Sequence, residues 1–174
     1  MNGNPDSAIA IQRRLLTERE RIFGPDHPDY AFSLFNLART YTRAGRFQEG
    51  LPLFQRTIEV RERALGSEHY LVGYAWMSYA VATAQSGDLP HSIPRFERAA
   101  SIFRTSLGPT DTSLQDALEG LAIVRTMSGQ TGPALDALEA AARAGYKRPA
   151  RLDQPPFTRL AGEPRFQALL SGMK

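Results

Sequence analysis

Residues 24–66 read GPDHPDYAFSLFNLARTYTRAGRFQEGLPLFQRTIEVRERALG, and the pattern of this stretch recurs along the chain. Two sets of glycines are spaced 42 residues apart: Gly24, Gly66 and Gly108, and Gly45, Gly87 and Gly129. A constant period of this size is typical of solenoid proteins, in which each repeat packs on its neighbours. The sequence therefore predicts a repeat fold, and such folds serve to hold a partner.

Each repeat is predicted to contain two helices separated by a glycine. In the first, Leu34, Leu37, Ala38 and Tyr41 are spaced by three and four residues, which is typical of a buried helical face. After the Gly45 break, a second helix is predicted from about residue 47 to 65. Pro28 suits the start of the first helix, because proline lacks an amide that would be unpaired there.

Aligning the sequence with itself after a shift of 42 residues tests this interpretation, and the alignment needs no insertion. Large positions stay large and small ones stay small: Leu34 aligns with Trp76 and Leu118, Phe54 with Phe96 and Leu138, and Gly50 with Ser92 and Ala134. Closely packed helices need this alternation, because a small residue admits the large one opposite.

The N-terminal stretch, residues 1–23, is predicted to form one helix that matches the second helix of an incomplete repeat. Asp6 or Ser7 is expected to cap it. Its apolar stripe contains Ile11, Leu15, Ile22 and Phe23. Because no preceding helix covers this stripe, we expect an open face around Ile11 and Leu15.

The predicted fold class is all-α, with repeats at 24–65, 66–107 and 108–145 and a C-terminal capping segment at 146–174. The capping segment has no counterpart one period earlier, but it is too apolar for a free tail, and a last short helix is predicted from Pro164 to Leu170. Pro52, Pro90 and Pro94 predict that the second helices of two repeats start late or loosely.

Composition narrows the possible functions. The chain has 174 residues and no cysteine, which excludes disulfides and thiolate metal sites and fits a cytoplasmic protein. No apolar run is long enough to span a membrane, and the N-terminus does not resemble a secretory signal. Seven basic and two acidic residues lie from Arg143 onward, against fourteen and sixteen before it. This distribution argues against a nucleic-acid groove in the repeats.

The first complete repeat resembles the tetratricopeptide repeat at Ala38, Tyr41, Gly45, Gly50 and Phe54. The longer period, with GPDHPD at 24–29, SLFNLA at 33–38 and ERALG at 62–66, is similar to the kinesin-light-chain type of that repeat. The resemblance covers roughly residues 8–144. It implies a right-handed superhelical solenoid of antiparallel helix hairpins that binds protein or peptide segments in a concave groove, without a cofactor.

The first helix of each repeat is expected to line this groove with the residues that do not pack in the core. These candidates are Phe32, Phe35, Asn36, Arg39 and Arg43; Tyr74, Met77, Ser78, Val81 and Gln85; and Asp116 and Glu119. Exposed aromatics and methionine suit adaptable peptide binding. Asn36 can donate to and accept from a peptide backbone, and Arg39 with Arg43 could hold a carboxylate or phosphate. Solvated arginines and packing between repeats are the alternative interpretations.

No motif for catalysis or for a cofactor is present, so an enzyme is not expected. His27 and His69 stand one period apart near acidic residues, but duplication of a loop explains the pair without a metal. Two alternative functions remain open. The open N-terminal face could mediate self-association or contact with another domain, or the basic C-terminal tail could dock on an acidic partner.

Overall fold

The computed structural model describes residues 5–173, and every regular element in this range is helical. The chain divides into two compact units, residues 1–88 and 89–174. Unit 1 contains α1 (Pro5–Phe23), α2 (Pro28–Arg43), α3 (Phe47–Leu65) and α4 (Tyr70–Gln85). Unit 2 contains α5 (Leu89–Ser106), α6 (Thr112–Met127), α7 (Thr131–Arg143), α8 (Pro149–Leu152), the 3₁₀ turn η1 (Phe157–Leu160) and α9 (Pro164–Gly172). The prediction of an all-α fold is confirmed.

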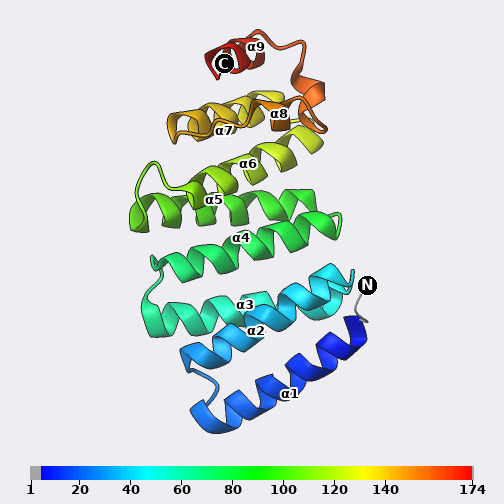
Figure 1. The fold of residues 1–174 in the computed structure, drawn as a ribbon, viewed down its shortest axis with the longest axis vertical. Coiled ribbons are helices and arrows are strands. Elements are labelled where there is room, and N and C mark those ends of the chain that lie inside the picture. Colours follow the sequence, from blue (N-terminus) through cyan, green and yellow to red (C-terminus); the bar gives the residue numbers. More distant parts are fainter. Residues whose placement is uncertain (1–4, 174) are drawn as a thin grey trace. The chain divides into compact units, whose positions relative to one another are not determined.

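In unit 1, successive helices pack side by side in chain order (Figure 1). The predicted core positions Leu34, Leu37, Ala38 and Tyr41 of α2 are all at most 3% exposed. Phe54 of α3 is 1% exposed and forms a core cluster with Ala38 and Ala82 of α4. The spacing by three and four residues therefore identified the buried face correctly.

Gly50 shows why this position of the repeat is occupied by a small residue. A Cβ atom built there would lie 3.1 Å from the carbonyl oxygen of Ala38 and 3.3 Å from the Cβ atom of Tyr41. Helices α2 and α3 can approach this closely only with a small residue on α3. The helix pair is separated at Gly45, whose φ of 71° lies in a region that side-chain-bearing residues rarely adopt.

Helix α1 packs on α2 through a face that differs from the predicted stripe. Ile9 is 4% exposed and clusters with Leu37 and Tyr41, whereas Ile11 and Leu15 are 63% and 51% exposed. Ile22 and Phe23 are also exposed. The expected open face is therefore present on α1.

The predicted cap of α1 is wrong. Asp6 and Ser7 lie inside the first turn, because the helix already begins at Pro5, and its capping position falls outside the described residues. Asp6 instead forms an ion pair of 3.2 Å with Arg46, just before α3. An acidic side chain in the first turn also interacts favourably with the helix dipole.

The predicted late start of the second helices is also wrong. Helix α3 begins at Phe47 and α5 at Leu89, so that Pro52 and Pro94 lie inside their helices. Pro90 is the second residue of α5, where its missing amide has no helical acceptor to lose. At Pro52 and Pro94, each helix loses one backbone hydrogen bond near its start and continues.

The recurring histidines cap helices. The Nδ1 atom of His27 accepts a hydrogen bond of 3.1 Å from the amide of Asp29, and that of His69 accepts one of 3.2 Å from the amide of Leu71. One period further on, Asp111 accepts from the amide of Ser113 at 2.7 Å. All three precede the first helix of a predicted repeat, so this position of the repeat is the N-cap of that helix.

Replacing His69 by alanine is expected to lower the free energy of unfolding by about 1 kcal/mol, because the amide of Leu71 loses its acceptor. His69→Asp should keep most of the stability, since aspartate fills the same position before α6. Urea denaturation of both variants measures the difference. Equal losses in the two variants would contradict a capping role.

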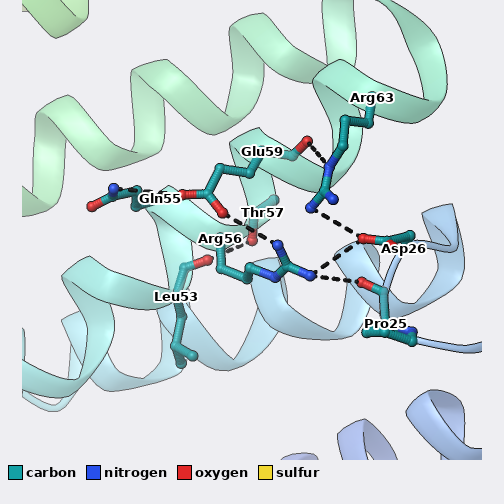
Figure 2. Close-up of polar contacts among 8 residues, drawn as sticks. All are labelled: Pro25, Asp26, Leu53, Gln55, Arg56, Thr57, Glu59 and Arg63. Carbon is teal, nitrogen blue, oxygen red and sulfur yellow. Dashed lines mark hydrogen bonds and ion pairs between the residues drawn. The ribbon is translucent and has the colours of Figure 1, made fainter.

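A polar network fixes the turn between α1 and α2 against α3 (Figure 2). The guanidinium of Arg56 donates to the carbonyl oxygen of Pro25 at 3.2 Å and pairs with Asp26 and Glu59, each at 3.3 Å. Arg63 also pairs with Asp26 at 3.0 Å. One guanidinium thus holds together a turn and a helix distant in sequence.

Candidate peptide-binding surface

The candidate residues of α2 divide into exposed and partly buried side chains. Phe32 is 50% exposed, and Arg39 and Arg43 are also exposed. Phe35 and Asn36 are partly buried. The α2 face therefore offers a half-exposed aromatic ring, with the guanidinium of Arg19 5.5 Å from its centroid, and two cations beside a partly buried amide.

Phe35 belongs to the edge of the core. Its ring meets that of Phe54 edge-on at 5.9 Å between centroids. The guanidinium carbons of Arg61 and Arg39 lie 4.7 and 5.6 Å from its centroid. Cations over an aromatic face stabilise its orientation. Phe35 is thus a fixed wall of the surface.

Arg61 is a structural residue that the sequence analysis missed. It is 4% exposed and donates to the carbonyl oxygen of Leu71 at 2.6 Å. One period earlier, Arg19 donates to the carbonyl oxygen of Asp29 at 3.1 Å. The spacing of these arginines was the available signal. Burial lowers the pKa of Arg61 to about 10, so the side chain stays charged near neutral pH.

On α4, Val81 is 39% exposed and Gln85 is also exposed, whereas Tyr74, Met77 and Ser78 are partly buried. Tyr70, at the start of the helix, was not among the candidates. It is 40% exposed, and its ring meets that of Tyr74 edge-on at 6.2 Å. Tyr70 stands one period after Pro28, and this change from proline to an aromatic residue was the signal that could have identified it.

The candidates on α6 are occupied by the C-terminal segment of the same chain. Glu119 is 9% exposed and pairs with Arg148 at 3.3 Å and with Arg151 at 3.0 Å. Asp116 pairs with Arg148 at 2.8 Å. The prediction that Glu119 faces an open groove is therefore wrong, because residues after the last repeat return to neutralise it.

Tyr146 packs in the same region and is 1% exposed. Burial, reinforced by the negative charge of Glu119, raises its pKa. The folded protein thus disfavours the phenolate. The stabilisation from the neutral ring is complete below the unfolded pKa of about 10 and declines as the pH rises above it.

We therefore expect the free energy of unfolding to fall by up to about 1 kcal/mol more between pH 9 and pH 11 than in a Tyr146→Phe variant. Urea denaturation of both proteins across this range measures the difference. Phenylalanine keeps the ring in place and cannot ionise. Identical pH profiles would show that Tyr146 ionises as easily in the folded protein as in the unfolded one.

Among residues 5–173, no group of three or more histidine or carboxylate side chains is arranged to hold a metal ion. His27 and His69 use their Nδ1 atoms as helix caps. No helix in this part of the chain is long and apolar enough to cross a membrane.

Antiparallel helix pairs with a fixed period, capped at equivalent positions, define the class of helical-repeat interaction proteins. The chain belongs to the tetratricopeptide repeat family, because the model of that family matches residues 1–63 and 36–105. This fold supports a protein–protein interaction scaffold, and proteins of this type are typically not enzymes.

Solved structures match over almost the whole chain. The kinesin light chain nearly identical TPR-like repeats of Podosopora anserina give a TM-score of 0.80 at 21% identity, over 99% of this chain and 86% of that one. BtubC (BKLC) of P. vanneervenii gives 0.79 at 16% identity, over 98% and 72%. The chain thus has the tetratricopeptide solenoid fold, of the kinesin-light-chain-like type. No curated protein matches the sequence.

Proposed function

We propose that this chain binds an extended peptide segment of a partner protein on the α2–α4 surface. This surface comprises Phe32, Phe35, Asn36, Arg39 and Arg43 of α2, and Tyr70, Tyr74, Met77, Ser78, Val81 and Gln85 of α4. It uses the first helices of the repeats proposed at 24–65 and 66–107. No cofactor is involved.

The observation that carries this proposal is the exposure of large apolar side chains beside polar ones. Phe32, Tyr70 and Val81 are 50%, 40% and 39% exposed. Clusters of exposed apolar groups mark contact sites. The amide of Asn36, one turn from Phe32, can bond to the backbone of an extended peptide, while the apolar groups receive its side chains.

The test is selection of binders from a displayed library of random peptides on the intact chain. Selected peptides are expected to lose at least tenfold in affinity for a Phe32→Asp, Val81→Asp variant, because charge replaces apolar contact at two exposed positions. Ile11→Asp on α1 is the matched control, since Ile11 is also exposed but lies outside the surface. Peptides that bind all three proteins equally would refute the proposed site.

A second candidate function is self-association through α1. Ile11, Leu15 and Ile22 are 63%, 51% and 59% exposed on one helix. Sedimentation velocity over a hundredfold range of concentration tests this function, with Leu15→Glu as the disrupting variant. A monomer at every concentration would eliminate self-association.

Docking through the basic C-terminal tail is less favoured, because three of its arginines already have partners. Arg148 and Arg151 pair with α6, and Arg165 pairs with Asp136 at 2.7 Å and Glu139 at 2.8 Å. These carboxylates would have to be released before an acidic partner could bind.

A further inference from the structure

Unit 2 contains a cavity of about 370 Å³ between α5, α6 and α7. Its lining residues are Arg104, Pro109, Leu114, Ala140, Arg143 and Ala144. The wall is thus apolar apart from two arginines, which come from the last turns of α5 and α7.

The repeat offers an internal comparison for this cavity. Two periods of 42 residues earlier, every lining residue has a counterpart in unit 1: Glu20, Pro25, Tyr30, Arg56, Glu59 and Val60. In unit 1 the guanidinium of Arg56 contacts two of these positions, Pro25 and Glu59, and also the adjacent Asp26 (Figure 2). Burial is the main cause that raises the pKa of Tyr30, and the negative charge of Glu20 raises it further. The positive charge of Arg56 lowers it. Glu20 therefore belongs to the same neighbourhood.

Two changes distinguish the cavity from this counterpart. The position of Arg56 is taken by Ala140, so the long side chain that stands at this position in unit 1 is absent. The acidic positions Glu20 and Glu59 become Arg104 and Arg143. The substitutions leave a space and reverse the sign of the charge beside it.

Direct partners for these two cations are absent from the described residues. Neither Arg104 nor Arg143 forms a hydrogen bond or ion pair within residues 5–173. The hydrogen bond from Arg165, followed by the charges of Arg165 and Arg143, lowers the pKa of the Glu139 carboxyl. Glu139 therefore pairs directly with Arg165 and interacts with Arg143 only at longer range. The two guanidinium groups are therefore available to an external anion.

We propose that this cavity binds a small phosphate monoester. The phosphate dianion would lie between Arg104 and Arg143, since guanidinium groups form charge-assisted bonds with phosphate oxygens and two cations balance its charge. The apolar body of the ester would lie against Leu114, Pro109 and Ala140. The site uses no residue of the α2–α4 surface, so it is independent of the proposed peptide binding.

The experiment is a titration of the full chain with phenyl phosphate, followed by calorimetry and by NMR of the backbone amides. We expect saturable binding, with shift changes centred on Leu114, Ala140 and Ala144. Arg104→Gln and Arg143→Gln should each weaken binding about tenfold, the loss expected for one charge-assisted contact. Arg159→Gln is the matched control, because it removes an exposed charge of unit 2 away from the cavity and should leave the affinity unchanged.

Ala140→Leu provides a second test, since the larger apolar side chain fills the space without adding a charge. It should abolish binding while the melting temperature shows that the fold is intact. Phenol, which lacks the anion, and inorganic phosphate, which lacks the ring, should both bind at least tenfold more weakly. The proposal is overturned if phenyl phosphate does not saturate, if both arginine variants bind as the wild type does, or if either fragment binds equally well.

Discussion

Gly120→Ala is expected to lower the free energy of unfolding by about 1–3 kcal/mol, the usual effect of overpacking a core. A Cβ atom at this position would lie 2.4 Å from Cε1 and 2.8 Å from Cζ of Phe96. Phe96 is 3% exposed, so its ring has no free space to move into. In an open helix the same substitution would stabilise by about 1 kcal/mol, so the sign of the change tests the packing.

The control is Gly132→Ala in α7, where an added Cβ has nothing within 4 Å. This variant should be neutral or slightly stabilising. Phe96→Leu removes the two clashing ring atoms, and combined with Gly120→Ala it should show a coupling energy of about 0.5–3 kcal/mol. Urea denaturation of the wild type, Gly120→Ala, Phe96→Leu and the combined variant completes this double-mutant cycle. Additive effects, or a stabilising Gly120→Ala, would contradict the close contact of α5 and α6.

Deleting residues 146–174 is expected to unfold unit 2 or make it aggregate. Tyr146, Leu152, Phe157, Leu160 and Phe166 are each at most 2% exposed. Burying one such side chain stabilises by about 1.5–3 kcal/mol. Losing five together is comparable with the whole stability of a small domain, about 5–15 kcal/mol.

A shorter deletion of residues 163–174 separates the contributions, because it removes α9 and Phe166 alone and should lower stability only moderately. Lys147→Gln with Arg159→Gln changes the charge of the tail without removing buried groups and should leave the melting temperature unchanged. Circular dichroism melts and light scattering measure these effects. A protein ending at Gly145 that melts like the full chain would show that the segment does not cap the repeats.

Helix positions could be predicted because their signals are local. The spacing by three and four from Leu34 to Tyr41 and the glycine breaks at Gly45 and Gly66 appear in every period, and the helices lie where this pattern places them. The errors were local as well. Pro52 suggested a late start, but one missing hydrogen bond does not prevent a helix from beginning at Phe47.

The candidate surface could be predicted only in part. Helical periodicity assigns Phe32 and Val81 to a face outside the core, and both are exposed. It gave no indication that Phe35 packs on Phe54 or that Arg61 supports it from α3. These contacts depend on the position and side-chain length of residues on a neighbouring helix, and the periodicity of one helix gives no information about them.

The amino-acid sequence by itself determined the repeat length, the helix pairs, the core columns and the tetratricopeptide class, because all of these recur at 42 residues. Only the tertiary structure decided that Glu119 is neutralised by Arg148 and Arg151, and that a cavity remains beside Ala140, the counterpart of Arg56. The physical reason is that a nonrepeating segment and a missing side chain leave no periodic signal. Their effects arise from what lies next to them in space.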